Sequence, residues 1–126
     1  MQKNMLYKKE LSFSSIHVQI TRLGNEYNVL IWGGDKPHIG CTVLSIPRPS
    51  LSGDGSVSVT SSVLNVTGHK DEQICRYLAE EIAKEEQTVT VCTGGFHYDN
   101  ITPVQIEEIL EGVKEILKNG DHCLSK

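Results

Sequence analysis

The chain has 126 residues, of which 38% are hydrophobic and 22% charged, and its formal net charge is −4 at pH 7. These values are typical of one globular domain that hides roughly two-thirds of its unfolded surface and folds without disulfides or a metal. The acidic net charge argues against a nucleic acid as the main partner, because phosphate binding needs a concentrated basic surface. No run approaches the roughly 18 apolar residues of a membrane span, and residues 1–13 lack the apolar core of a signal peptide. We therefore expect a cytoplasmic protein that is not embedded in a membrane.

The first half of the chain predicts strands. Apolar residues that alternate with polar ones, or form short runs, place four strands at residues 16–23, 27–32, 41–46 and 57–66. Gly24-Asn25 provides the turn of a hairpin between the first two, and Gly33-Gly34 ends that hairpin. Pro47 and Pro49 are expected to terminate the third strand, because proline cannot donate to a sheet ladder.

The second half alternates between helix and strand. The spacing of Ile74, Leu78 and Ile82 predicts a helix over residues 70–86, and residues 88–93 form a short strand closed by Gly94-Gly95. Residues 102–105 (Thr-Pro-Val-Gln) form a capping box that starts a second helix, and Asn119-Gly120 is expected to stop it.

This order of elements predicts a single α+β domain, with a mostly antiparallel sheet and both helices on one face. The connection through the first helix to the fifth strand is a candidate parallel, right-handed crossover. We assign residues 13–120 to the domain, residues 1–12 to an N-terminal extension and residues 121–126 to a polar tail.

Polar groups gather in four loops, each at the end of a predicted strand, at residues 33–40, 47–50, 68–71 and 94–100. The two glycine pairs permit positive φ and close approach of the backbone to a phosphate or carboxylate, which Lys36, Arg48 or Lys70 could neutralise. His69 and Lys70 also lie where the free N–H groups of a helix start favour an anion. If the loops meet at one edge of the sheet, they form one polar cleft. The same residues also fit ordinary turns and a solvated Lys70-Asp71 pair.

Other kinds of site remain open at this point. His38, His69 and His97, with Asp35 or Asp99, could hold a metal or act as general bases. The four cysteines form no C-x-x-C pair, and Cys41 and Cys92 fit buried strand positions better than activated thiols. Trp32 and Phe96 flank the glycine pairs, where each could stack on a flat ring, although packing in the core is the more common role.

The runs GGDKPHIG, PRPS, TGHKD and GGFHYDNIT, in this order, resemble the small D-type subunit of prenylated-flavin-dependent hydroxyarylic-acid decarboxylases, the LpdD-like family. The resemblance covers about residues 13–118. It implies a fold similar to proteasome-assembly-chaperone domains and a chaperone-like protein, commonly dimeric, that binds prenylated FMN or FMN transiently. The ligand would pass to a large decarboxylase subunit of the gallate or 4-hydroxybenzoate type, with a flavin prenyltransferase as a second candidate partner. The resemblance implies no independent decarboxylase activity.

Carried over residue by residue, the family motif also points to Gly40, Pro49 and Asp71, to which we assign no binding role. We assign a cofactor-binding role to the other motif residues and to one added lysine: Gly33, Gly34, Asp35, Lys36, His38, Arg48, Gly68, His69, Lys70, His97, Asp99 and Asn100. In this hypothesis Arg48 and Lys70 hold the flavin phosphate, while the histidines and Asp35 contact the ring or the ribityl chain. No catalytic residue and no metal ligand are assigned. A small metal- or histidine-dependent enzyme and a purely structural decarboxylase subunit are the alternatives.

Overall fold

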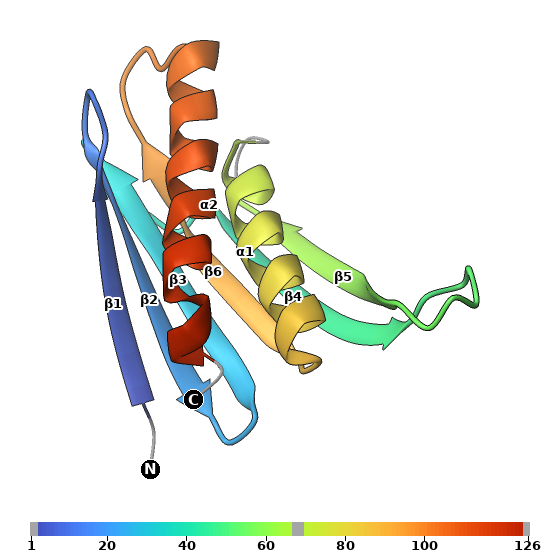
Figure 1. Cartoon of the computed structure of the whole chain (residues 1–126). Coiled ribbons are helices and arrows are strands. Elements are labelled where there is room, and N and C mark those ends of the chain that lie inside the picture. The colour runs from blue at the N-terminus through green and yellow to red at the C-terminus, as the bar shows by residue number, and fades with distance from the viewer. Residues whose placement is uncertain (1–2, 67–69, 125–126) are drawn as a thin grey trace.

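The structure, a computed structural model, describes residues 3–66 and 70–124. These residues form six strands and two helices: β1 (Lys3–Glu10), β2 (Ser15–Leu23), β3 (Glu26–Gly34), β4 (Cys41–Pro49), β5 (Val57–Asn65), α1 (Lys70–Glu86), β6 (Thr90–His97) and α2 (Pro103–Leu124). Figure 1 shows both helices lying side by side on one face of a single twisted sheet. The prediction of a single α+β domain with a mostly antiparallel sheet is therefore confirmed.

The strand order in the sheet is β1-β2-β3-β6-β4-β5. Neighbouring strands are antiparallel except β3 and β6, which run parallel with Gly34 opposite His97. The chain thus crosses from β5 through α1 and inserts β6 into the middle of the sheet. β5 and β6 run in the same direction, as expected, but β4 lies between them, so the parallel neighbour of β6 is β3.

The core lies between the sheet and the helices. Ile16, Val18 and Ile20 of β2 are buried while the residues between them are not, which is the period-two pattern of a strand with one covered face. Ile74, Leu78 and Ile82 of α1 and four residues of α2 (Ile109, Val113, Ile116 and Leu117) complete the core at helical spacing. Each fully buried side chain of this size contributes about 1.5–3 kcal/mol, so packing holds the helices on the sheet.

The N-terminal residues belong to the sheet. Residues 3–10, which we expected to form an extension, pair with β2 along the whole of β1, from Lys3 opposite Arg22 to Glu10 opposite Ser15. Met5 and Tyr7 pack against the core from this strand. The sequence does not predict this strand, because its alternating core residues, Met5 and Tyr7, are few and are flanked by lysines.

Several predicted element ends are wrong. Both glycine pairs lie inside strands, since β3 runs to Gly34 and β6 runs through Gly94 and Gly95 to His97. β4 continues to Pro49. β6 pairs with β4 only as far as Ser45, so Pro47 and Pro49 lie beyond that pairing, on a stretch where one side of β4 has no neighbouring strand to accept a backbone N–H.

The end of α2 also differs from the prediction. This helix passes through the expected stop at Asn119-Gly120 and ends at Leu124. A glycine inside a helix costs only about 1 kcal/mol relative to alanine, so it does not by itself end one. In the part of the chain that the structure describes, neither helix has the length and apolarity that crossing a membrane requires.

Candidate functional site

Two of the four polar loops, together with Lys70 and Asp71 of a third, meet at one end of the sheet. β3 and β6 are adjacent and parallel, so their carboxyl ends lie together, and residues 35–40 and 98–102 leave from there. The Asp35 N–H donates to the carbonyl of His97 (2.7 Å), and the Asp99 N–H donates to Asp35 Oδ2 (3.3 Å). α1 begins at the same end with Lys70. In open, mostly parallel sheets, ligands commonly bind outside the carboxyl ends of the strands and beside helix starts. In this mostly antiparallel sheet, only the β3–β6 pair offers that arrangement.

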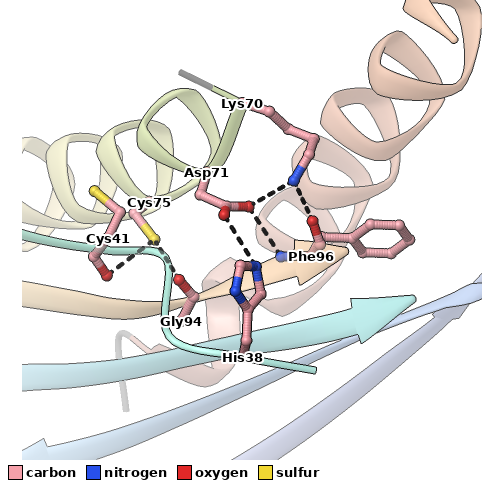
Figure 2. A network of polar contacts seen from close by, with 7 residues as sticks. All are labelled: His38, Cys41, Lys70, Asp71, Cys75, Gly94 and Phe96. Carbon is pink, nitrogen blue, oxygen red and sulfur yellow. Dashed lines mark hydrogen bonds and ion pairs between the residues drawn. The ribbon is translucent and has the colours of Figure 1, made fainter. Parts of the chain in front are cut away.

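Asp71 is the centre of this site (Figure 2). Its carboxylate is 3% exposed and accepts hydrogen bonds from the Phe96 N–H (2.9 Å) and from Lys70 Nζ (2.9 Å). His38 Nε2 lies 3.2 Å from Asp71 Oδ2, and Lys70 Nζ also donates to the Phe96 carbonyl. A buried carboxylate is stable only with such partners. The alternative of a solvated Lys70-Asp71 pair is therefore wrong.

The register of the sheet explains why a carboxylate fits there. The last paired residues of β4 and β6 at this end are Cys41 and Gly94, so the N–H of Phe96 has no β4 partner. Asp71 supplies the missing acceptor. A buried N–H without an acceptor costs free energy comparable to a lost hydrogen bond, so Asp71 links α1 to the end of β6.

Two glycines make room for this arrangement. A methyl group on Gly40 would collide with the Asp71 carboxylate, and one on Gly95 would lie 2.9 Å from His38 Nε2 and 3.0 Å from Asp71 Oδ2. The family motif points to Asp71 as well as to Lys70, but Asp71 is not among the residues to which we assigned cofactor binding. Gly40 and Gly95 are the signal in the sequence that could have indicated this role, because a glycine can mark a place where another group lies close to the backbone as well as a turn.

Two imidazoles present polar atoms beside the buried carboxylate. The rings of His38 and His97 lie 5.9 Å apart between centroids, and their side chains are 35% and 44% exposed. His97 Nε2 lies 3.0 Å from Asp99 Oδ1, while His38 Nε2 is buried and faces Asp71. The His97 ring is thus held by a hydrogen bond to Asp99, whereas the buried His38 Nε2 lies 3.2 Å from the Asp71 carboxylate without a hydrogen-bond partner.

The remaining predicted residues at this end have distinct roles. Lys36 and Asp35 are exposed on the loop after β3. Gly34 has φ 86°, and a side chain there would collide with the His97 carbonyl, whereas Gly33 packs under the Phe96 ring. Asn100 has φ 57°, which asparagine tolerates better than most residues, and it shapes the turn before α2. Gly68 and His69 lie outside the described residues.

Arg48 lies at the opposite end of the sheet. It is seven positions along β4 from Cys41, which at roughly 3.3 Å per residue is about 23 Å away. Its Nε donates to Thr60 Oγ1 (2.9 Å). Arg48 and Lys70 of one chain therefore do not hold the same phosphate, and the condition that all four loops meet is not fulfilled for residues 47–50.

Arg48 lines a hollow of about 420 Å³ with Pro47, Pro49, Ser50 and neighbouring loop residues. Asp54 lies in the same loop, where hydrogen bonds from Ser56 lower the pKa of its carboxyl group to about 2. Asp54 itself does not line the hollow. The hollow lies at the opposite end of β4 from Cys41 and is therefore separate from the end of the sheet that carries His38, Lys70 and His97.

Three cysteines are buried behind the site. Cys75 Sγ lies 3.9 Å from the carbonyl of Cys41 and 4.0 Å from that of Gly94, as Figure 2 shows. Burial, reinforced by the neighbouring Cys75, raises the pKa of Cys41 to about 12, and it raises the pKa of Cys92 well above its usual range. The interpretation of Cys41 and Cys92 as buried strand residues is confirmed, because neutral buried thiols are poor nucleophiles.

Neither aromatic residue beside the glycine pairs is placed to stack on a ligand at this end. Phe96 is fully buried and meets Phe13 edge to face, with ring centroids 5.9 Å apart. Trp32 stacks on His17 instead, with ring centroids 5.0 Å apart and planes 7° from parallel. Within residues 3–66 and 70–124, no group of three or more His, Cys, Asp or Glu side chains is placed to hold a metal ion.

The described residues form a small α+β domain with a polar site at one end of its sheet. The chain superposes with a TM-score of 0.54 on a chain of the structure titled "Crystal Structure of a Novel Chaperone Complex for Yeast 20S Proteasome Assembly", at 14% identity over 94% of this chain and 96% of that one. That likeness shows the fold alone. The family model of the prenylated flavin chaperone LpdD-like domain matches residues 12–125 of the sequence. The chain therefore belongs to this family. No curated protein matches it.

Proposed function

We propose that this chain binds prenylated FMN, or FMN, transiently at the end of the sheet formed by His38, Lys70, Asp71 and His97, and delivers it to a partner hydroxyarylic-acid decarboxylase. Membership of a prenylated flavin chaperone family supports the ligand class. The observation that carries the location is the buried Asp71 carboxylate, which fixes His38 and Lys70 beside the half-exposed His97. A fixed, partly exposed set of hydrogen-bonding groups suits a ligand that must be both recognised and released.

Different residues at this end are proposed to contact different parts of the flavin. Lys36 is exposed, with no ion pair in the described part of the chain, so it replaces Arg48 as the cation for the flavin phosphate. Lys70 is less suited to that role, because Asp71 and the Phe96 carbonyl already engage its ammonium group. His38, His97, Asp35 and Asp99 are left for polar atoms of the ring and the ribityl chain. The prenylated flavin itself would supply decarboxylation chemistry only after transfer to the partner enzyme.

The remaining parts of the proposal concern partners and compartment. The large decarboxylase subunit is the recipient, a flavin prenyltransferase is the candidate donor, and the chain acts as a homodimer. The three free buried cysteines fit a reducing compartment such as the cytoplasm. No independent decarboxylase activity is proposed.

A transfer experiment tests delivery. The protein is loaded with prenylated FMN, freed of excess cofactor and mixed with cofactor-free decarboxylase, whose activity is then followed. We expect faster activation than with the same concentration of free cofactor, loss of that gain in His97→Ala, and retention of it in Arg48→Ala. Activation no faster than with free cofactor would refute delivery and favour a purely structural subunit.

A further inference from the structure

The hollow beside Arg48 has no part in the proposed function. It is bounded by the ends of β4 and β5, by the loop that joins them and by Gln87, directly after α1. The β4–β5 hairpin extends beyond the start of β6, where Thr90 pairs with Ser45 (Figure 1). The volume of the hollow, about 420 Å³, falls within the range of about 300–1,000 Å³ that is usual for small-molecule sites.

Arg48 brings a fixed positive charge to this hollow. Its Nε donates to Thr60 Oγ1 (2.9 Å) and its Nη1 donates to the Pro49 carbonyl (3.3 Å), so two neutral acceptors hold the guanidinium group in place. These bonds use two of its five N–H donors. Within residues 3–66 and 70–124, Arg48 forms no ion pair and Nη2 has no acceptor. An arginine that is already positioned but carries no anion is prepared to bind one.

The walls of the hollow are apolar on one side and carry hydroxyl groups on the other. Pro49 and Val57 are opposite each other in the β4–β5 register, and Pro47 lies two positions before Pro49. Ser50 and Ser56 also line the hollow, where the Ser50 N–H donates to the Ser56 carbonyl (3.0 Å) and closes the hairpin. A ligand that fits these walls combines a negative charge with an apolar body.

We propose that this hollow is a second ligand site, which binds a small monocarboxylate with an apolar body. The carboxylate pairs with the free edge of the Arg48 guanidinium group, formed by Nη2 and the second N–H of Nη1, and the body packs against Pro47, Pro49 and Val57. The planar guanidinium group matches a carboxylate through two parallel N–H···O bonds. This inference goes beyond the proposed function and does not rest on flavin binding at the other end of the sheet.

The carboxylate of Asp54 in the same loop does not occupy this site. It is exposed, and it accepts hydrogen bonds from the Ser56 N–H (2.9 Å) and the Ser56 hydroxyl (2.6 Å). It neither lines the hollow nor pairs with Arg48. Solvent and salt screen the charge of an exposed group such as this one, so the guanidinium group remains the charge that a ligand in the hollow meets.

A nuclear magnetic resonance titration of the full chain with benzoate tests the site. We expect saturable shifts in the backbone amide signals of Ser50, Gly53 and Gly55, whereas those of Gly40 and Gly95, at the other end of the sheet, stay in place. Benzamide has the same shape without the charge. It should bind at least about tenfold more weakly, because it loses the charge-assisted pair with Arg48.

Two matched variants locate the charge that is recognised. Arg48→Gln should weaken benzoate binding at least about tenfold. Arg22→Gln removes the same charge from a residue that does not line the hollow and whose Nε donates to the Gly24 carbonyl (2.8 Å), and it should change the affinity less than about twofold. The dispersion of the amide signals establishes that each variant is folded, and the comparison of benzoate with benzamide needs no variant.

The absence of saturable shifts with benzoate would overturn the inference, and so would equal affinities for benzoate and benzamide. An unchanged affinity for benzoate in folded Arg48→Gln would also contradict it. Shifts confined to Gly40 and Gly95 would assign the carboxylate to the His38 end of the sheet and refute a separate site in the hollow.

Discussion

Among single residues, Asp71 is the one whose contacts tie the site together. Its carboxylate joins three separate pieces of chain: the start of α1, the end of β6 and the loop that carries His38. The hydrogen-bond partners of this one buried group thus set the position of the residues around it. We therefore treat Asp71 as a positioning residue rather than as a ligand contact.

The variant Asp71→Asn tests this role. It keeps an acceptor for the Phe96 N–H but removes the charge opposite Lys70, and breaking a buried ion pair of this kind is strongly destabilising. We expect the free energy of unfolding to fall by about 2–3 kcal/mol, measured by urea denaturation. Asp99→Asn makes the same chemical change at a side chain that is 68% exposed, and it should stay within about 0.5 kcal/mol of the wild type. Equal effects of the two changes would contradict the account.

Single residues were also where sequence analysis was least reliable. The hypothesis of a single polar cleft grouped His38, His97 and Lys70 on the condition that the loops meet. It grouped Arg48 with them, because charge and a family motif do not reveal at which end of a strand a loop emerges. The burial of Asp71 depends on where β4 stops pairing with β6, and that register has no local signal.

At the element scale, the start of α2 shows local sequence acting as expected. The Thr102 N–H donates to Gln105 Oε1 (2.9 Å), and the Gln105 N–H donates to Thr102 Oγ1 (3.2 Å). These reciprocal bonds are those of the predicted capping box, and they satisfy donors that a helix start otherwise leaves free.

Thr102→Ala should lower the free energy of unfolding by about 1 kcal/mol, because the side-chain acceptor of the cap is lost. The measurement is the urea concentration at the midpoint of unfolding, which should fall while the dependence of the free energy of unfolding on urea concentration stays the same. Thr102→Ser retains the hydroxyl group and should recover most of the loss. If Ser and Ala were equally destabilising, the hydroxyl bond would not be what stabilises the start of this helix.

Element ends were harder to predict than element types. The extent of α1, Lys70–Glu86, was predicted from apolar spacing alone, because its buried stripe is complete. The glycine pairs were expected to end strands, yet they continue β3 and β6, since neighbouring strands supply hydrogen bonds that override weak local preference. β1 was missed because it is a short edge strand between lysines.

At the scale of the whole molecule, the order of elements predicted the class of fold but not the order of strands. Nothing local indicates that β6 enters between β3 and β4, although this insertion creates the parallel pair at whose ends the site lies. The same arrangement leaves one sheet face uncovered and places the hollow beside Arg48 at the far end. The candidate site and the hollow beside Arg48 therefore lie at opposite ends of the sheet, so substitutions at one end can be compared with substitutions at the other in a binding experiment.

The most direct test of the central claim is a fluorescence titration of the purified protein with prenylated FMN and with FMN. We compare the wild type with the double variant Lys36→Ala, His97→Ala, whose altered side chains are at least partly exposed, and with Arg48→Ala at the opposite end. We expect saturable binding that weakens at least about tenfold in the double variant, since a charge-assisted hydrogen bond contributes about 1.5–3 kcal/mol, and that changes less than about twofold in Arg48→Ala. Absence of saturable binding, or weakening confined to Arg48→Ala, would contradict a flavin site at the His38–Asp71 end of the sheet.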